Sequence, residues 1–458
     1  MSYSSFIAKK RVESVTSGFD ADLSRYPLFD YQAPITHWAL RRGKAAIFAN
    51  TGLGKTIMQT VWADQVLRHT NKPVLILAPL GVTYQTVRKA AEYGIEVRLA
   101  KSNEDIKGPG IYVTNYERMG KFDLSVLSGV ALDEASILKG DGSMRRGITE
   151  GFAGTPYRLS CTATPSPNDH MELGTQSEFL GIMSQTEMLA QYFVHDGSDT
   201  SKWRLKGHGI KRFWEWVASW AVLIHKPSDL GFDDGAHILP PLHYHEHVVE
   251  TAPQEGLFVE PALSLIDRNR ARKDSVQDRV SIAAEKANSI DDQVLIWCNL
   301  NDESKALADS IDGAVEVRGS DSDEHKEKAL LGFSNGTVKK LVTKPSIAGF
   351  GMDWSGCNQQ IFVGLSDSWE KYYQAIRRCY RFGQTRPVHV HIVSADTEGA
   401  VVANIKDKDR KNAEMARQMR GLMAGFMSRN VLGSEIEKTE YEPDQKIIIP
   451  AFVTGNAA

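Results

Sequence analysis

The sequence predicts an α/β protein with two tandem parallel-sheet units, a helical insertion between them and a C-terminal helix. Short apolar runs bounded by Gly, Pro, Asn or Asp alternate with helix-like stretches from about residue 45 to residue 162. A second alternating series runs from residue 294 to residue 393, and the intervening chain has few β-like runs. Such alternation is typical of parallel sheets whose strands are joined by helices.

The expected elements follow this order along the chain. Residues 1–28 are a lead-in without clear periodicity. Residues 29–170 form the first unit, with strands expected at 45–49, 74–78, 111–114, 130–133 and 159–162. Residues 171–240 form the helical insertion, which ends at two prolines. Residues 241–397 form the second unit, with strands expected at 294–298, 315–317, 340–342, 361–363 and 388–393. Residues 398–458 contain a helix, expected at 398–425, and a tail.

The composition is that of a globular protein. The chain has 458 residues, 42% of them hydrophobic, and 54 Lys and Arg against 57 Asp and Glu. Collagen-like, coiled-coil and wholly disordered chains are excluded. Its four cysteines form no CxxC pair, so neither a disulfide scaffold nor a structural zinc site is expected. No segment has the ~18 apolar residues of a membrane span, and residues 1–11 lack the apolar core of a signal peptide. A cytoplasmic protein without a membrane partner is therefore expected.

A phosphate-binding loop is predicted where the first strand ends and the helix at 56–69 begins. The stretch reads Ala49-Asn50-Thr51-Gly52-Leu53-Gly54-Lys55-Thr56. Its glycines allow consecutive N–H groups to face one anion, and the helix N-terminus adds its dipole. Lys55 is expected to reach the β- and γ-phosphates of a nucleotide, and Thr56 to offer its hydroxyl to Mg²⁺. The strict pattern has Gly in place of Ala49, so a plain Gly-rich turn is the alternative.

Paired carboxylates end the strand expected at 130–133. Strand ends of α/β sheets are where such proteins bind ligands. Asp133 is expected to hold Mg²⁺, largely through water, and Glu134 to orient and deprotonate an attacking water. The alternative for these two residues is a solvated loop.

Two arginines in the second unit suit a triphosphate. Arg378 and Arg381 are three residues apart in a stretch that begins helix-like and ends at Gly383, so they are expected to share a helix face. Guanidinium groups bind phosphates in a bidentate manner. Supplied from the second unit, they would complete a site only when the cleft between the units closes. The alternative is a solvated basic helix.

The order of these motifs resembles that of the superfamily-two helicases, and more closely their Swi/Snf-type branch of DNA-dependent ATPases. The matching stretches are Gln32, residues 49–56 (motif I), Asp133-Glu134-Ala135-Ser136 (motif II), Thr162-Ala163-Thr164-Pro165 (motif III), residues 349–354 (motif V) and residues 374–384 (motif VI). The stretch 343–351 and the Arg-Phe-Gly-Gln at 381–384 look most like helicases of phages and prophages. The resemblance covers about residues 29–420.

The resemblance implies two RecA-like P-loop domains that close on ATP and Mg²⁺ and move along DNA. It implies an adenine-reading role for Gln32, and it adds Gly351 and Asp353 of motif V to the nucleotide site formed by residues 51–56 and Asp133. Two positions depart from the family: Ser136 replaces the usual His of motif II, and Asp353 stands where relatives often carry Asn. Because a carboxylate repels a phosphate backbone, Asp353 is not expected to contact DNA.

Candidate DNA contacts come from both units. They are Pro79, Thr114, Asn115, Tyr116, Lys344, Ser346 and Gly349. Backbone N–H groups and hydroxyls hold phosphates without reading the base sequence. For each of these residues a plain turn or cap role is the alternative.

The insertion combines basic and aromatic residues. Residues 201–226 contain Lys202, Arg204, Lys206, Lys211, Arg212 and Lys226 together with Trp203, Trp214, Trp216 and Trp220. Basic residues with interleaved aromatics suit backbone binding and base stacking, as in a wedge that separates a duplex. We favour the alternative, in which Trp214, Trp216 and Trp220 pack the insertion.

Two further groups of residues are weak metal candidates. His243, His245 and His247 alternate along a strand-like run, for which a solvated strand face is favoured over a metal site. Glu324-His325-Lys326 lies in a charged stretch and forms no convincing nuclease site.

The sequence thus predicts an ATP-dependent DNA helicase or translocase. The alternatives are a translocase that remodels branched DNA without unwinding, and a non-catalytic ATP-gated DNA-binding module. Single-stranded, duplex or branched DNA is the expected partner, and RNA stays open. The phage resemblance adds replication or recombination proteins as partners, and a bacterial or host cytoplasm as location. A monomer is favoured.

Overall fold

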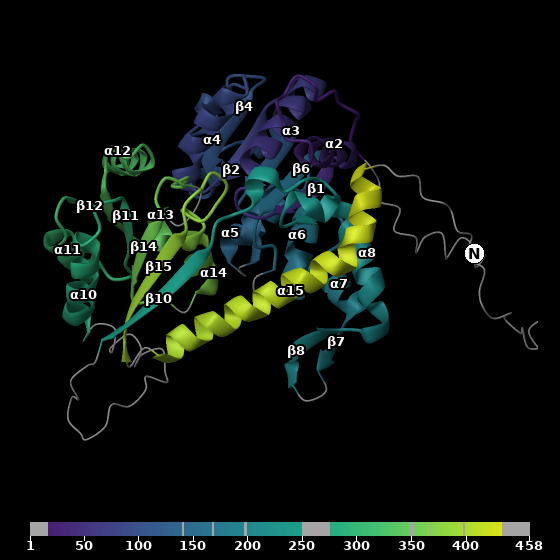
Figure 1. Cartoon of the computed structure of the whole chain (residues 1–458). Coiled ribbons are helices and arrows are strands. Elements are labelled where there is room, and N and C mark those ends of the chain that lie inside the picture. The colour runs from purple at the N-terminus through teal and green to yellow at the C-terminus, as the bar shows by residue number, and fades with distance from the viewer. Residues whose placement is uncertain are drawn as a thin grey trace, which may run out of the picture.

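The structure, a computed structural model, describes residues 17–139, 142–166, 169–196, 199–249, 275–348, 352–366, 368–396 and 399–432. It contains two parallel sheets with helices packed on them, which confirms the predicted fold class (Figure 1). All ten strands that the two alternating series predict are present.

The first sheet has the strand order β3-β4-β2-β5-β6-β1-β9, and all its pairings are parallel. The strands are β1 (Lys44–Ala49), β2 (Val74–Ala78), β3 (Val97–Leu99), β4 (Ile111–Asn115), β5 (Gly129–Asp133), β6 (Tyr157–Thr162) and β9 (Ala221–Ile224). Its central strands are buried along their whole length because helices cover both faces. The carboxyl ends of β5, β6 and β1 are neighbours, so the segments that follow them meet at one edge.

Helices of the first domain are α2 (Gln32–Arg42), α3 (Lys55–Thr70), α4 (Leu80–Glu92) and α5 (Ser143–Gly151). Helix α3 ends at Asn71, which has φ of 52° and caps the helix in the left-handed conformation that Asn tolerates. Short 3₁₀ turns connect the elements: η1 (Asn103–Asp105), η2 (Tyr116–Lys121), η3 (Leu124–Val126), η4 (Ala135–Lys139), η5 (His170–Glu172), η6 (Gly207–Gly209), η7 (Pro227–Leu230) and η8 (Gly235–His237).

The second sheet has the order β10-β15-β14-β11-β13-β12 and is again parallel. Its strands are β10 (Leu242–Val249), β11 (Val294–Trp297), β12 (Ala314–Val317), β13 (Lys340–Thr343), β14 (Gln359–Val363) and β15 (Val388–Ala395). The helices are α10 (Val276–Asn288), α11 (Asn301–Ser310), α12 (Asp323–Ser334), α13 (Pro345–Ala348) and α14 (Trp369–Ile376). Two hydrophobic clusters of buried residues pack on this sheet.

The segment predicted as a helical insertion is only partly helical. It contains α6 (Leu173–Leu180), α7 (Gln185–Tyr192) and α8 (Ile210–Trp220), but also an antiparallel hairpin of β7 (Phe193–Asp196) and β8 (Asp199–Leu205). Strand β9 then pairs with β1, so the first sheet continues to residue 224. This four-residue apolar strand directly follows a helix, and its short run does not stand out by periodicity.

Helix α15 (Gly399–Leu432) connects the two domains (Figure 1). Near its start, Val401 and Ile405 belong to a hydrophobic cluster of the second domain. Further along, Met419, Met423 and Met427 belong to the core of the first domain. None of the helices in the described ranges is long and apolar enough to span a bilayer.

Candidate nucleotide site between two domains

The predicted phosphate-binding loop lies between β1 and α3. Gly52 and Gly54 have φ of 90° and 77°, values that L-residues with a side chain rarely adopt. Ala49 is the last residue of β1 and needs no such freedom, so its departure from the strict pattern changes little. The loop thus has the curled backbone that a phosphate cradle requires, at the N-terminus of a 16-residue helix.

Lys55 points back into this loop. Its Nζ atom donates to the carbonyl oxygens of Ala49 (2.7 Å) and Asn50 (3.3 Å). Burial lowers the pKa of Lys55, and the carboxylates of Glu134 and Asp133 oppose that shift. A partly buried cation is therefore held beside the loop, where anionic oxygens would be its natural partners. The Oγ1 atom of Thr51 is buried there without a hydrogen-bond partner.

Asp133 ends β5, and Glu134 follows with φ of 60°, a left-handed conformation that is strained for a residue with a side chain. Such strain persists where the surrounding contacts maintain it. Glu134 Oε1 accepts a hydrogen bond from Thr162 Oγ1 (2.7 Å), and its Oε2 accepts one from Gln374 Nε2 (3.5 Å). The carboxylate is thereby held by both domains.

Asp133 and Thr56 fit a divalent cation. Burial, and then the neighbouring charge of Glu134, raise the pKa of Asp133 to about 6. The Asp133 carboxylate stands at the carboxyl end of β5, and the hydroxyl of Thr56 lies in the first turn of α3. Oxygen donors of this kind suit Mg²⁺.

Arg378 and Arg381 do not share a helix face, which corrects the prediction. Helix α14 ends at Ile376, and both arginines lie beyond it. The carbonyl oxygen of Met352 instead holds both guanidinium groups, at 3.2 Å from Arg378 Nη1 and 2.9 Å from Arg381 Nη1. Arg378 also donates to Gln374 Oε1 (3.0 Å).

The charges of the two arginines interact with charged side chains of the first domain. Burial, followed by repulsion from Arg381, lowers the pKa of Arg378 to about 9, and the charge of Glu134 opposes this. The charge of Arg381 in turn contributes to lowering the pKa of Lys55, after burial. Arg381 also lies near Asp353, with Nε 3.6 Å from Oδ1. The predicted arginines, lysine and carboxylates therefore form one charged cluster across the interface.

Direct contacts join motif VI to the phosphate-binding loop. Tyr373 Oη donates to Asn50 Oδ1 (3.1 Å). A Cβ atom on Gly52 would lie 2.8 Å from the backbone nitrogen of Phe382, so glycine permits this close approach. His225, which follows β9, lies with its Nδ1 3.1 Å from Asn50 Nδ2. Burial lowers the pKa of His225 to about 4, and it is a neutral partner of the loop at pH 7.

Gln32 lies beside the same loop. It is buried at the start of α2 and donates from Nε2 to the carbonyl oxygen of Leu53 (3.1 Å). Next to it, the rings of Phe29, Tyr31, His237 and Phe382 form one cluster with centroid separations of 4.7–6.1 Å. An aromatic surface thus adjoins the predicted base-reading residue, and it draws on both domains.

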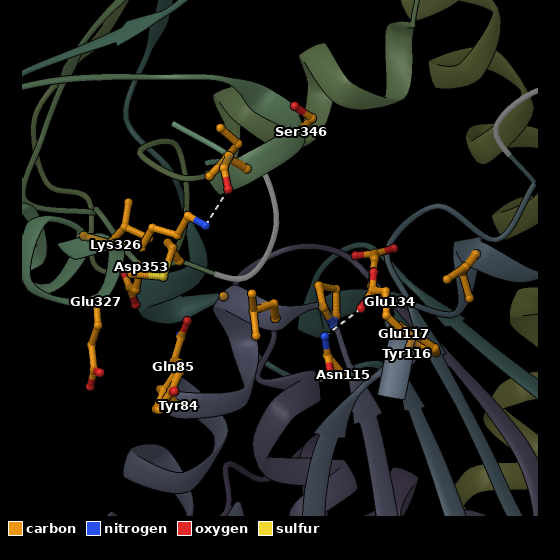
Figure 2. Close-up of a pocket in the computed structure, with 18 of the residues that line it drawn as sticks. Tyr84, Gln85, Asn115, Tyr116, Glu117, Glu134, Lys326, Glu327, Ser346 and Asp353 are labelled. Carbon is orange, nitrogen blue, oxygen red and sulfur yellow. Dashed lines mark hydrogen bonds between the residues drawn. The ribbon is translucent and has the colours of Figure 1, made fainter. Parts of the chain in front are cut away.

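A cavity of about 670 Å³ lies between the domains on another side of the motifs. Figure 2 shows Asn115, Tyr116 and Glu134 on one side of it and Ser346 on the other. Of the predicted DNA contacts, Pro79, Asn115, Tyr116 and Ser346 line this cavity. Glu134 and Asp353 line it as well, so the cavity and the nucleotide site share a wall.

Two predicted DNA contacts lie elsewhere, and a third is not among the described residues. Thr114 is buried inside β4, with 1% of its surface exposed. Lys344 donates from Nζ to Asn301 Oδ1 (2.6 Å) and is not part of the cavity lining. Gly349, like the predicted nucleotide-site residue Gly351, falls outside the described residues.

The aromatic residues of the insertion mainly pack. Trp214, Trp216 and Trp220 are buried on α8, as favoured from the sequence. Trp203, on β8, lies over His195 of β7 with ring centroids 3.7 Å apart. The packing role of the three α8 tryptophans is therefore confirmed.

The histidine run lies on a partly exposed strand face, as favoured from the sequence, with His243 exposed and His245 and His247 half-buried. His243, His245 and His247 alternate with His389 and His391 of β15 in a ladder whose ring centroids are 4.6–5.3 Å apart. His245 Nε2 lies 3.0 Å from His389 Nδ1, and His247 Nε2 lies 3.1 Å from His391 Nδ1. Within the described ranges no three His, Cys, Asp or Glu side chains are arranged to hold a metal ion.

The residue-level prediction missed several side chains of this interface. Tyr373, Gln374 and Thr162 contact the predicted site, and they lie in or next to motifs VI and III, which could have indicated them. His225, and Glu370, which forms an ion pair with Lys139, carry no comparable signal, because neither lies in a motif and their partners are far away in the sequence.

Comparison with known proteins supports the helicase resemblance. Residues 276–383 match the helicase conserved C-terminal domain. The bifunctional helicase and thymine dioxygenase JBP2 of Leishmania infantum is 34% identical over 125 residues, which are 26% of this chain and 11% of that protein. The same protein of Leishmania braziliensis is 36% identical over 101 residues, 21% of this chain and 9% of that protein. This chain thus spans about a tenth of the length of these relatives.

Among solved structures, the SWI2/SNF2 ATPase core of Sulfolobus solfataricus in complex with double-stranded DNA aligns with a TM-score of 0.39 and 16% identity, over 92% of this chain and 98% of that chain. The domain match and the JBP2 relatives bear out the predicted resemblance to superfamily-two helicases. The likeness to phage and prophage helicases stays a prediction.

Proposed function

We propose that this chain, which carries a helicase C-terminal domain, is an ATP-dependent DNA helicase or translocase. The observation that supports it best is the convergence at one domain interface of the phosphate-binding loop, the Asp133–Glu134 pair and the two motif VI arginines. A site divided between two domains can couple hydrolysis to a change in their relative position.

Each residue has a distinct proposed role at this site. The loop N–H groups from Thr51 to Gly54 and the ammonium group of Lys55 bind the phosphates. Glu134 orients the attacking water and takes its proton. Arg378 and Arg381 exchange the Met352 carbonyl for phosphoryl oxygens and stabilise charge that develops on them. Gln32 reads the base.

Thr56 and Asp133 would hold Mg²⁺, which neutralises charge on the transferred phosphate when bound. The reason for this assignment is the chemistry of the donors, a carboxylate at the end of β5 and a hydroxyl in the first turn of α3, both of which suit Mg²⁺. Asp353 lies near Arg381 and also lines the interdomain cavity, where its carboxylate is proposed to repel a phosphate backbone and not to contact it.

DNA is proposed to bind in the cavity between the domains. Pro79, Asn115, Tyr116 and Ser346 are the candidate contacts, and basic side chains of Arg88, Lys139 and Lys326 also line the cavity. The carboxylates of Glu117, Glu134, Glu327, Asp353 and Glu370 line it as well, so the three basic side chains, and not the cavity lining as a whole, are the proposed partners of a phosphate backbone. From the resemblance alone, we propose that the protein acts in phage DNA replication, recombination or repair, as a cytoplasmic monomer.

The test is ATP hydrolysis by the wild type and by Glu134→Gln, without polymer and with single-stranded, duplex or forked DNA or RNA. We expect DNA to stimulate hydrolysis and the variant to lose ~10²–10⁴ of the rate, because the amide keeps the volume but accepts no proton. The polymer that stimulates most is the track. Rates that are flat across all polymers would instead favour an ATP-gated binding module.

An assay of DNA strand separation distinguishes a helicase from a remodelling translocase. A motor that unwinds forked duplexes is a helicase. Stimulation by branched DNA without separation of its strands would favour the remodelling translocase.

A further inference from the structure

Glu370 belongs to the second domain but binds side chains of the first. It lies in the first turn of α14 and forms an ion pair with Lys139 of η4. It also accepts a hydrogen bond from Thr164 Oγ1, in motif III, at 3.3 Å. The Glu370 side chain is 12% exposed and that of Lys139 is 28% exposed, so the pair is largely removed from water.

Short contacts lead from Glu370 to the proposed base. The backbone N–H of Thr164 donates to Thr162 Oγ1 (3.0 Å), and Thr162 Oγ1 donates to Glu134 Oε1 (2.7 Å). Glu370 is thus linked to the carboxylate of Glu134 through two threonines. A shift of Glu370 would alter the position of Thr164 and, through it, the hydroxyl that orients Glu134.

The same ion pair faces the interdomain cavity. Lys139 and Glu370 both line it, as do Asn115 and Ser346. A polyanion in the cavity would attract Lys139 away from Glu370 or press the two domains together around the pair. Either way, whatever occupies the cavity acts directly on this ion pair.

We propose that Glu370 is a positioning residue that links occupancy of the cavity by DNA to the orientation of Glu134. The inference rests on the proposed function, since it assigns the means by which DNA stimulates hydrolysis. The signal passes from the Lys139–Glu370 pair to Thr164, Thr162 and Glu134. Glu370 itself touches neither the nucleotide nor the water.

A plain structural ion pair is the competing explanation. Partly buried ion pairs often add little net stability, because desolvation offsets the attraction. A structural pair would change stability, or change all rates by one factor. A positioning pair changes the ratio of the DNA-stimulated rate to the basal rate.

The experiment measures ATP hydrolysis with and without saturating duplex DNA in the full chain. The variants are Glu370→Gln, Lys139→Gln, the double variant with both changes, and the reversed pair Lys139→Glu with Glu370→Lys. Glu246→Gln is the matched control, because Glu246 forms an ion pair with Lys406 away from the domain interface. The KM for ATP and the melting temperature are recorded for each.

We expect Glu370→Gln and Lys139→Gln each to lower the stimulation ratio by about tenfold, within the usual range of coupling between two sites. The double variant should lose no more than either single variant, since both remove one interaction. The reversed pair should stay as low as the single variants, because position 139 would then repel a polyanion and position 370 could no longer accept the hydrogen bond from Thr164. Glu246→Gln should keep the wild-type ratio.

Three results would overturn the inference while leaving the motor intact. The first is a stimulation ratio for Glu370→Gln equal to that of Glu246→Gln. The second is an equal fall of the basal and stimulated rates. The third is a double variant whose loss is the product of the two single losses. A wild type that DNA does not stimulate overturns the proposed function itself, and this inference with it.

Discussion

The strained backbone at Glu134 permits a test that is independent of catalysis. Two variants, Glu134→Ala and Glu134→Gly, both remove the side chain and its bond to Thr162, so they lose the same contacts. They differ at the backbone, because φ of 60° is strained for alanine and free for glycine. The left-handed conformation costs an L-residue about 1–2 kcal/mol.

The relief of this strain in Glu134→Gly is partly offset, because a chain with glycine loses about 0.4–1 kcal/mol more conformational entropy on folding. We therefore expect Glu134→Gly to be more stable than Glu134→Ala by about 0.5–1 kcal/mol. Urea unfolding of the nucleotide-free protein, followed by tryptophan fluorescence, measures the difference as a shift in midpoint. Both variants should be inactive.

In a matched control, replacing alanine by glycine should lower the stability and not raise it. Ala91 is an exposed residue in the last turn of α4. Ala91→Gly should lower stability by about 0.5–1 kcal/mol, as glycine does in helices. If Glu134→Gly is no more stable than Glu134→Ala, the left-handed backbone at Glu134 is wrong, and with it the idea that surrounding contacts hold this residue in a strained conformation.

Three further predictions concern the same interface. Arg381→Gln should reduce the rate constant of hydrolysis by ~10³ or more with little change in the KM for ATP, because the guanidinium acts in the transition state; steady-state kinetics measure this, and a change confined to KM contradicts it. Gly52→Ala should weaken domain closure, because its Cβ would lie 2.8 Å from the Phe382 nitrogen; fluorescence transfer between labelled domains would detect a wider average separation, and unchanged transfer with full activity counts against the contact. The pKa of His225 is lowered from 6.5 to about 4, so the folded chain binds that proton less tightly than the unfolded chain. The free energy of unfolding should therefore fall by at most about 3 kcal/mol as the pH falls from about 6.5 to 4. His225→Gln should flatten the curve of stability against pH in this window.

The elements that the sequence predicted correctly are those whose position depends on residues close together in the chain. The strands of both sheets are continuous apolar runs bounded by turn residues, and the loop between β1 and α3 is defined by its two glycines. Strand β9 and the β7–β8 hairpin were not predicted, because short strands next to a helix show no clear alternation of apolar and polar residues. The two arginines share the carbonyl oxygen of Met352 as a partner, but the shared helix face predicted for them was wrong.

What sequence could not predict are polar contacts between domains. Gln374 and Glu134 are 240 residues apart in the chain, and Tyr373 and Asn50 are 323 apart. No periodicity or spacing encodes such a pair, because it depends on how two separately folded sheets pack. The motif residues could still be assigned to the site, since each comes at a strand end or a helix end where geometry is local. Glu370 lies outside the motifs, four residues before motif VI. Its proposed role comes only from its contacts with Lys139 and Thr164 across the interface. The residues that sequence patterns identify are therefore those proposed for the chemical step, while those proposed to link that step to DNA emerge only from the packing of the two domains.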